Sequence, residues 1–231
     1  MSDPMTRGLF ITGTGTGVGK TYVAALVARA LRSTGQRVGV YKPVASGCEM
    51  RDGQLISADA FALWEAAGRP ATLEQVCPQC FAAPLAPHLA ARADGRRVDA
   101  ELLRTGLGFW RDQCDVVLVE GAGGLMSPLG DELYNAELAE EFDFPLVVVA
   151  ANVLGTINAT LQTLITADVF RDGLAVAGVV LNSPTEPASD PSTDSNANEL
   201  RRRCVAPLLA EVPYDRGFDR DVDWWALAGD T

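Results

Sequence analysis

The stretch LFITGTGTGVGKTYVAALVARAL, residues 9–31, places a glycine-rich turn between two apolar patterns. Leu9, Phe10 and Ile11 are bulky and apolar, which is typical of a buried strand. Residues 23–31 repeat apolar side chains at helical spacing and predict a helix with one buried face. The glycines therefore lie where a strand turns into a helix, so that backbone N–H groups and the helix start can approach an anion without a Cβ in the way. This arrangement is typical of a phosphate-binding loop.

Two residues at the end of this turn indicate nucleotide chemistry. Lys20 offers a positive charge to the outer phosphates, and the hydroxyl of Thr21 offers a ligand to Mg²⁺. The pattern G-x-x-x-x-G-K-[ST] is not matched, because Thr14 stands where its first glycine belongs and the outer glycine is Gly13. The pattern G-x-G-x-x-G fails as well, at Val18. A glycine-rich turn without a ligand is the alternative, but the order of strand, loop, Gly-Lys-Thr and helix favours phosphate.

Length and composition predict a single P-loop nucleotide-binding α/β domain over residues 1–231. The net charge of −11 argues against a nucleic-acid partner, because binding to phosphodiesters needs a basic face. The longest apolar run, residues 145–155, has about half the length of a membrane span, so we expect no membrane partner. The short, polar start of the chain predicts no signal peptide.

The chain has five scattered cysteines, which favours a reducing compartment, and we expect the cytoplasm. Cys77-Pro-Gln-Cys80 has the spacing of a zinc or redox pair. The chain has no second pair of this kind, and its one histidine is His88, so we interpret the two cysteines as ordinary thiols near a loop.

Strand-like and helix-like segments alternate along the chain. Strands are expected at 37–43, 115–124, 145–150, 174–182 and 206–214, and helices at 57–68 with Ser57 as cap, 99–113, 132–142 and 156–170. Uninterrupted Val and Leu runs predict a parallel sheet with helices on both faces, which is a P-loop NTPase-like α/β fold. Residues 183–198 are rich in Pro, Ser and Asp and predict a surface loop.

Ligands of such sheets bind at the carboxyl ends of the strands. Beyond the phosphate loop, the polar residues expected there are Lys42, Ser46, Asp59, Glu120 and Asn182. The oxygens of Thr21, Asp59 and Glu120 suit one Mg²⁺ ion, and two lysine ammonium groups suit a transferring phosphoryl group. The alternatives are a solvated lysine at 42, a helix cap at 59, an indirect role for 120 and ordinary loop polarity at 46.

Five motifs, in this order and spacing, resemble the dethiobiotin synthetase family over residues 8–215. They are GTGTGVGKT at 13–21, YKPVASG at 41–47, LVEGAGG at 118–124, LGTIN at 154–158 and VVLN at 179–182. The resemblance implies a ligase that converts 7,8-diaminononanoate, CO₂ and ATP to dethiobiotin, ADP and phosphate. The reaction proceeds through a carbamate and its mixed anhydride with phosphate. Mg²⁺ is the implied cofactor, and a homodimer is the implied assembly.

The resemblance also implies roles for individual residues. Lys42 and Lys20 are the implied catalytic residues, and Thr21, Asp59 and Glu120 the implied Mg²⁺ ligands. Nucleotide contacts are implied for Gly17, Val18, Gly19, Lys20, Thr21, Tyr22, Asp59, Glu120, Gly121, Ala122, Gly123, Asn182, Ser183, Val212, Pro213 and Tyr214, with Asn182 at the adenine. Substrate contacts are implied for Thr16, Ser46, Pro84, Gly155 and Asn158, the last two at a helix start across the dimer interface.

The chain departs from the family pattern at Gly15 and Gly17, which are acidic in many members, and at Ala159, which is commonly histidine. The aromatic that some members carry in the long loop is also absent, and Asn196 stands near that place.

Four other classes of protein fit the sequence less well. A partition-type P-loop ATPase switch usually carries an extra lysine early in the loop, where this chain has Gly15. A GTPase needs Asn-Lys-x-Asp, but Asn182 is followed by Ser183 and Pro184. A cobyrinate-type amide synthetase needs an amidotransferase domain, for which 231 residues leave no room. A non-catalytic nucleotide-binding module does not need both lysines together with both carboxylates.

Overall fold

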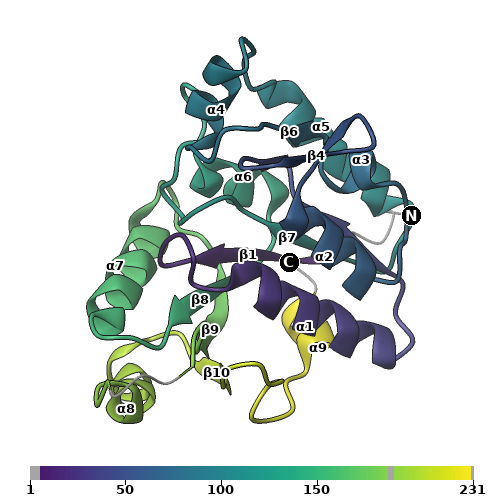
Figure 1. The fold of residues 1–231 in the computed structure, drawn as a ribbon. Coiled ribbons are helices and arrows are strands. Elements are labelled where there is room, and N and C mark those ends of the chain that lie inside the picture. Colours follow the sequence, from purple (N-terminus) through teal and green to yellow (C-terminus); the bar gives the residue numbers. More distant parts are fainter. Residues whose placement is uncertain (1–5, 187–189, 230–231) are drawn as a thin grey trace.

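A computed structural model of the chain describes residues 6–186 and 190–229. The strands are β1 (Arg7–Gly13), β2 (Val38–Tyr41), β3 (Val44–Ala45), β4 (Glu49–Arg51), β5 (Gln54–Ile56), β6 (Gln79–Cys80), β7 (Val116–Glu120), β8 (Leu146–Ala151), β9 (Val176–Asn182) and β10 (Leu208–Val212). The helices are α1 (Lys20–Ser33), α2 (Ala58–Ala66), α3 (Leu73–Val76), α4 (Pro87–Ala93), α5 (Ala100–Arg111), α6 (Asn135–Phe142), α7 (Thr156–Val169), α8 (Thr193–Arg203) and α9 (Trp224–Leu227). Figure 1 shows these elements around one central sheet.

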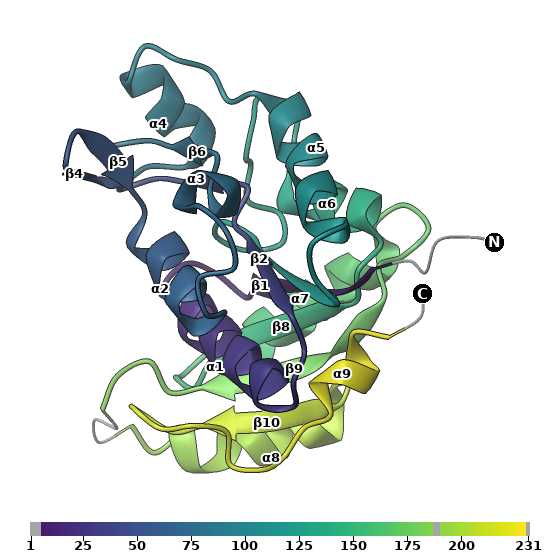
Figure 2. The same cartoon turned by 90° about the vertical axis from the view of Figure 1, so that its right-hand side faces the viewer.

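The central sheet has six strands in the order β10-β9-β8-β1-β7-β2, and all of its neighbouring strands are parallel. Right-handed crossovers decide which face each helix covers. The chain leaves β1 toward β2 through α1, and it moves in the opposite direction through α5, α6, α7 and α8. Consequently α1 packs on one face, with α2 and α9 beside it, while α5 to α8 cover the other (Figures 1 and 2). The predicted fold class is confirmed.

Burial of the sheet on both faces explains its uninterrupted apolar strands. Each residue of β7 is buried, and Leu9, Phe10 and Ile11 of β1 have no exposed surface. On α1, Val23 and Val27 are fully buried, as their helical spacing predicts. The apolar residues of the strands and of this helix face thus form one contiguous core.

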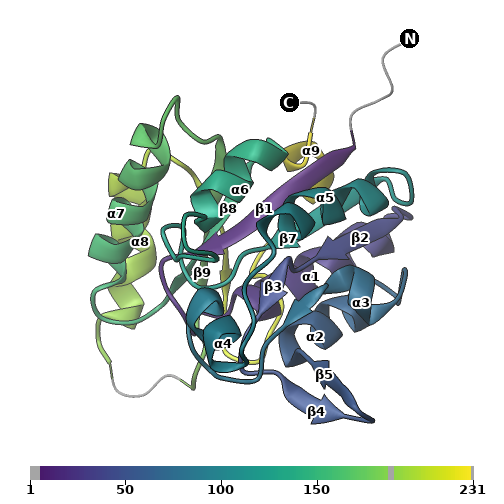
Figure 3. The same cartoon turned by 90° about the horizontal axis from the view of Figure 1, so that it is seen from above.

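The segment between β2 and α5 is less regular and lies beyond the carboxyl edge of the sheet. It contains the short parallel pair β3–β6, the antiparallel hairpin β4–β5 and the helices α2 to α4. Figure 3 shows α4 and the hairpin on the opposite side of the molecule from α9 and the beginning of β1. Of these elements the sequence predicted only α2, where the side chain of Ser57 accepts a hydrogen bond from the backbone N–H of Ala60 as expected.

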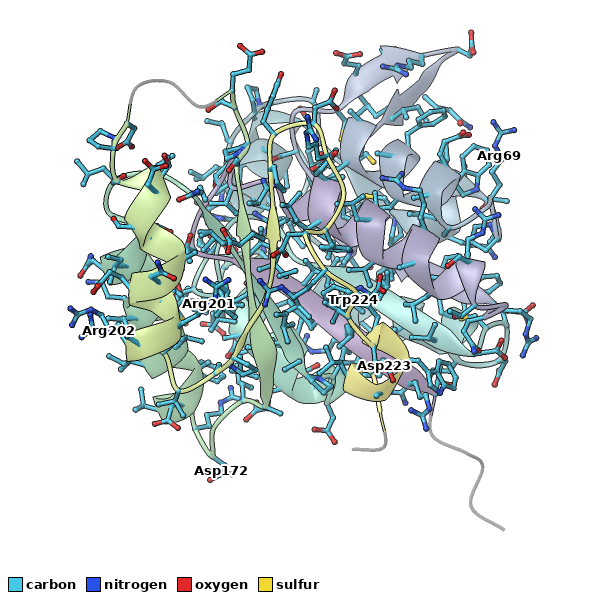
Figure 4. All side chains as sticks on the ribbon, turned by 90° about the horizontal axis from the view of Figure 1, so that it is seen from below. Arg69, Asp172, Arg201, Arg202, Asp223 and Trp224 are labelled. Atoms are coloured by element: carbon cyan, nitrogen blue, oxygen red, sulfur yellow. The ribbon has the colours of Figure 1, made fainter. Side chains whose placement is uncertain are left out.

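The prediction of a loop over 183–198 is wrong from residue 193 onward, because α8 occupies Thr193–Arg203. Tertiary contacts hold this helix despite its polar composition. Leu200 is fully buried, and the amide of Asn196 donates to the side chain of Asn152 at 2.9 Å. In Figure 4, Arg202 extends outward from α8, whereas Arg201 lies toward β10 and pairs with Glu211 at 2.6 Å.

Two predictions fall partly outside the described residues: the one on the chain start, at residues 1–5, and the one on the polar segment, at 187–189. Within the described ranges, every helix is too short or too polar to cross a lipid bilayer.

Candidate active site

A cavity of about 650 Å³ opens at the carboxyl edge of the sheet. It is lined by Thr16, Gly17, Gly19, Lys20, Thr21, Tyr22, Lys42, Ala45, Ser46, Asp59, Glu120, Ala122, Gly123, Asn182, Ser183, Pro184, Tyr214 and Asp215. Ala45, Pro184 and Asp215 are the lining residues that the sequence did not predict. Because the strand ends meet at one edge, segments far apart in the sequence contribute to a single cavity.

The glycine-rich loop takes a conformation that requires glycine at two positions. Gly17 and Gly19 have φ values of 76° and 90°, which L-residues with a side chain rarely adopt. At Gly19 a Cβ would also lie 2.1 Å from the side-chain nitrogen of Asn182. The loop ends at α1, whose first residue, Lys20, turns back and donates a hydrogen bond to the carbonyl of Gly15 at 3.0 Å. The loop thus surrounds the lysine ammonium and the free N–H groups of the helix start.

A buried network of charges forms one wall of the cavity. The ammonium of Lys42 lies 2.5 Å from Oε1 of Glu120 and 3.2 Å from Oδ2 of Asp59. The hydroxyl of Thr21 donates to the same Oε1 at 2.9 Å. The side chains of Lys42 and Glu120 are only 4% and 1% exposed, whereas Asp59 is 52% exposed. The strand ends of β2 and β7 therefore meet the starts of α1 and α2 in one polar cluster.

The network sets the protonation of its members. Burial opposes the charge of Lys42, but the carboxylates of Glu120 and Asp59 outweigh burial and raise its pKa above the ordinary value. Burial also works against the charge of Asp59, but Lys42 and the Thr21 hydroxyl lower its pKa. For Lys20 burial dominates and lowers the pKa. Lys42 is thus a permanent ammonium group at neutral pH and has no free base form to accept a proton.

The oxygen atoms of this network fit a divalent cation. The second carboxylate oxygen of Glu120, Oε2, is buried and has no hydrogen-bond partner. It belongs to the same cluster as the Thr21 hydroxyl and the exposed carboxylate of Asp59, and all three are the hard donors that Mg²⁺ prefers. Among the described residues, no group of three or more His, Cys, Asp and Glu side chains is arranged to hold a metal. The protein oxygens would therefore share a cation with phosphate and water, which is usual for Mg²⁺ in nucleotide sites.

Lys20 and Lys42 are the only two lysines of the chain; its other 17 basic residues are arginines. Both lysines are buried, at 8% and 3% exposure, and both line the cavity. An ammonium group is a compact point charge that fits between closely spaced oxygens, whereas a guanidinium is a wide planar fork. The distribution of lysine therefore marks the two places where this chain needs a small cation.

The residue predicted to contact adenine, Asn182, lines the main cavity. Asn182, at the end of β9, is 2% exposed and donates a hydrogen bond to the carbonyl of Val18 at 2.9 Å. Its amide thereby braces the phosphate loop and still lines the cavity. Val212 and Pro213 line a smaller neighbouring cavity of about 320 Å³, which shares Ser183 with the main one.

Five predicted residues do not line the main cavity or its neighbour. Val18 and Gly121 lie behind it, in the phosphate loop and after β7. Pro84 packs against Gly47, next to Ser46. Gly155 and Asn158 lie at the exposed beginning of α7. The structure of one chain therefore brings together the predicted nucleotide residues but not all of the predicted substrate residues.

Asn135 supports the loop after β7, and no sequence motif pointed to it. This side chain has no exposed surface, accepts from the N–H of Ala122 at 3.1 Å, and donates to the carbonyls of Ala122 and Gly124 at 2.7 Å each. Ser127 adds a further contact by accepting from the N–H of Gly124 at 2.8 Å. A buried asparagine at a helix start resembles an ordinary cap in sequence, so only the fold shows its bonds to the loop.

The fold and the cavity define a P-loop nucleotide-binding α/β protein. Among solved structures, the chain is similar to a ParA family ATPase from Chlorobium tepidum, with a TM-score of 0.54, 16% identity, and coverage of 92% of this chain and 86% of the other. It is also similar to the cell division ATPase MinD from Pyrococcus furiosus, with a TM-score of 0.50, 22% identity, and coverage of 91% and 84%. At such identities the likeness concerns the fold alone.

A family profile described as an AAA domain matches residues 7–221. The ATP-dependent dethiobiotin synthetase of Rhodopirellula baltica is 47% identical over 219 residues, which cover 90% of this chain and 84% of that protein. The corresponding protein of Anaeromyxobacter dehalogenans is 43% identical over 93% of both chains, and that of Aromatoleum aromaticum 38% identical over 95% of both. The chain belongs to the dethiobiotin synthetase family.

We expect Asn135→Leu to destabilise the fold by about 2 kcal/mol, because the part-buried N–H and carbonyl of Ala122 lose their side-chain partner, while the carbonyl of Gly124 keeps only the N–H of Ser127. Urea unfolding of the variant and of Asn198→Leu, a change on the exposed face of α8, gives the comparison. Nucleotide affinity measured below the unfolding transition should also fall for Asn135→Leu alone. Equal stability of the two variants would contradict the support that we assign to Asn135.

Proposed function

We propose that this protein is an ATP-dependent dethiobiotin synthetase, a ligase that forms dethiobiotin, ADP and phosphate from 7,8-diaminononanoate, CO₂ and ATP. Membership of the family and its close curated relatives support this assignment. The single structural observation that carries it is the ammonium of Lys42, held by Glu120 and Asp59 in the cavity that also contains Lys20.

The chemistry explains why such a site needs charge and positioning more than a base. One amine of the substrate adds to CO₂ and forms a carbamate, which is a poor electrophile because an oxyanion is a poor leaving group. The carbamate oxygen then takes the γ-phosphoryl group, and ADP leaves. The second amine attacks the carbonyl carbon, phosphate leaves, and the ureido ring closes. We assign Lys20 and Lys42 to neutralise the charge of the phosphoryl group in transit, since both are cationic and neither needs to move a proton.

We propose that Thr21, Asp59 and Glu120 hold Mg²⁺ together with the nucleotide phosphates. The orphaned oxygen of Glu120 and the exposure of Asp59 support this ligand set. When bound, Mg²⁺ would supply charge neutralisation at the phosphates. The salt bridges to Lys42 hold both carboxylates at the wall of the cavity.

We propose that the nucleotide binds to the remaining residues of the main cavity and of the neighbouring cavity. The phosphates would lie along Gly17 to Tyr22, and the base between Asn182, Ser183 and the segment 212–214. Gly121, Ala122 and Gly123 would border the nucleotide on the β7 side. The side-chain carbonyl and second N–H of Asn182 are suited to a base edge, which presents both a donor and an acceptor.

We propose that Thr16 and Ser46 contact the diamine and that Pro84 lies behind Ser46 and supports it. Thr16 lines both the main cavity and a cavity of about 310 Å³ that reaches toward α7 and Ala159. Gly155 and Asn158 lie outside both, and this supports a second subunit that offers its α7 start to the substrate carboxylate. We therefore propose that the protein is a homodimer and that each chain forms a single nucleotide-binding domain. We also propose that it works in the cytoplasm, because five free cysteines suit a reducing compartment.

The test of the proposed function measures ATP turnover and dethiobiotin formation in parallel. We expect ATP hydrolysis to depend on both the diamine and bicarbonate, and to stop when EDTA removes the divalent cation. Turnover that ignores the diamine and bicarbonate would favour a partition-type ATPase switch, to which the chain is related only through a distant fold likeness.

Lys42→Ala should abolish ring closure while nucleotide binding stays within a few-fold of the parent. Loss of one charge contact to the transition state costs on the order of 3 kcal/mol or more, which corresponds to a rate decrease of at least about 100-fold. Urea unfolding of Lys42→Ala checks that the buried carboxylate of Glu120, left without its partner, has not unfolded the protein. Arg37→Ala, which breaks an exposed pair with Asp115 away from the cavity, should leave the rate unchanged. Normal ring closure by Lys42→Ala would refute its catalytic role.

The proposed dimer predicts that exposed apolar side chains on α7 and directly before it are buried in solution. Leu154, Ile165 and Val169 are 81%, 61% and 67% exposed in the single chain. Ile165→Asp should shift the sedimentation coefficient from dimer to monomer, because a charge at an apolar interface costs several kcal/mol unless it is paired. Leu89→Asp on α4, which is 42% exposed, is the matched control and should leave the dimer intact. A parent protein that sediments as a monomer would contradict this assembly.

A further inference from the structure

Three cysteines outside the active site gather into one cluster. Cys77 follows α3, Cys80 ends β6, and Cys48 precedes β4, so that three separate segments contribute the sulfur atoms. The sulfurs of Cys77 and Cys80 lie 3.7 Å apart, and the backbone N–H of Cys48 donates at 3.0 Å to the carbonyl of Phe81, directly after Cys80. Cys114 and Cys204, the other two cysteines, take no part in it. The sequence predicted ordinary thiols at 77 and 80 and did not place Cys48 beside them.

The cluster is open to small molecules. A cavity of about 400 Å³ between the β4–β5 hairpin and α3 has Cys77 and Cys80 in its wall, together with Met50, Leu55 and Arg96. Figures 1 and 2 show this hairpin, β6 and α3 close together beyond the sheet edge. Cys80 is half-buried, and the guanidinium of Arg96 lies over the ring of Phe81 and donates to the backbone carbonyl of Cys80 at 3.3 Å. The cavity is largely apolar, with Glu74 and Arg96 as its two charged residues, and it gives a small disulfide access to Cys80.

The surroundings of Cys80 favour its thiolate. Hydrogen bonding with the thiols of Cys48 and Cys77, a backbone N–H at Ser57 and the charge of Arg96 lower the pKa of Cys80 against the opposing effect of burial. The same hydrogen bonds, together with burial, raise the pKa of the Cys48 and Cys77 thiols. One reactive sulfur therefore lies beside a second thiol that stays protonated until it is needed.

We propose that Cys80 and Cys77 form a redox-active pair that reacts with low-molecular-weight disulfides, with Cys80 as the attacking sulfur and Cys77 as the resolving one. The proposal stands on the 3.7 Å contact, the opening to the cavity and the third thiol at Cys48. A metal site is the competing interpretation of three thiols. Within the described residues, however, no group of His, Cys, Asp and Glu side chains is arranged to hold a metal ion.

The chemistry balances with a small disulfide as the oxidant. The thiolate of Cys80 attacks one sulfur of that disulfide, the old S–S bond breaks, and the leaving thiolate takes the electron pair and a proton from solvent. Cys77 then loses its proton to solvent and attacks the sulfur of Cys80 in the mixed disulfide. The second small thiol leaves. The protein loses two thiol hydrogens and gains one disulfide, and the reagent is reduced to two thiols.

Backbone contacts connect this pair to the substrate side of the active site. The N–H of Lys42 donates to the carbonyl of Val76 at 2.8 Å, directly before Cys77. The N–H of Phe81, directly after Cys80, donates to the carbonyl of Ala45 at 3.0 Å, directly before Ser46. A disulfide requires the sulfurs to approach to about 2.05 Å, so these segments must adjust. If the chain acts as proposed, oxidation should raise KM for the diamine more than it changes nucleotide affinity.

The experiment uses the full reduced chain and glutathione disulfide as the probe. After incubation and trapping of free thiols, intact mass and peptide mapping should show a Cys77–Cys80 disulfide that dithiothreitol reverses. This readout does not depend on enzymatic activity, so it can fail or succeed separately from the proposed function. The KM for the diamine and the Kd for ATP are then measured on the oxidised and re-reduced protein.

Variants distinguish the sulfur atoms. Cys80→Ser should react at least about tenfold more slowly, because it removes the thiolate. Cys77→Ser should stop at the mixed disulfide on Cys80, whereas Cys48→Ser should still form the Cys77–Cys80 bond. Cys204→Ser, a matched change in a half-buried cysteine outside the cluster, should behave like the parent.

Three results would overturn the proposal. The first is a rate for Cys80→Ser equal to that of the parent, and the second is a disulfide that joins Cys48 to either partner in place of Cys77 to Cys80. The third is purified protein that retains one zinc per chain against a chelator and does not react until the zinc is removed. Every variant changes only sulfur to oxygen, so we expect each one to fold. Circular dichroism and the melting temperature check this.

Discussion

The contact between Lys42 and Glu120 is the interaction on which the rest of the site depends. Both side chains are almost fully buried, and neither charge would be tolerable there alone, because removing one partner of a buried ion pair costs about 3–5 kcal/mol. The pair joins the ends of β2 and β7, and Thr21 and Asp59 attach the starts of α1 and α2 to it. A parallel sheet makes this possible, since it brings all of its strand ends to one edge.

The remaining features of the cavity maintain this charge arrangement. The glycine conformations at 17 and 19 leave room for the loop to surround Lys20, and Asn182 braces that loop from the neighbouring side of the sheet. Asn135 performs the equivalent task for the segment after Glu120. The site is therefore stiff before any nucleotide arrives, and preorganised charges need little rearrangement when charge moves in the reaction.

The irregular segment between β2 and α5 has a different character. It consists of short strands and helices, and it lies beyond the sheet rather than within it. It supplies Ser46 and Asp59 to the active site and also holds the thiol cluster. The phosphate side of the cavity rests on the central sheet, whereas its outer wall is built from short elements joined to the core by side-chain burial and a few backbone bonds, such as that from Lys42 to Val76. Variation in this wall can therefore alter substrate contacts without disturbing the phosphate loop.

The sequence by itself predicted the strands of the sheet, most of its covering helices and the polar residues at the strand ends, and its resemblance to a family implied most of the remaining cavity lining. Strands and helices that are buried need apolar side chains at fixed spacings, and these spacings can be read directly from the sequence. The residues that end the strands must lie close together once the strands are parallel. The tertiary structure alone decided α8, where Asn196 and Leu200 are buried by contacts that a polar sequence does not show. The tertiary structure alone also showed that Asn135 supports the loop after β7 and that Cys48 lies beside Cys77 and Cys80. These contacts join segments that are distant in the sequence, and such contacts leave no periodic pattern in it.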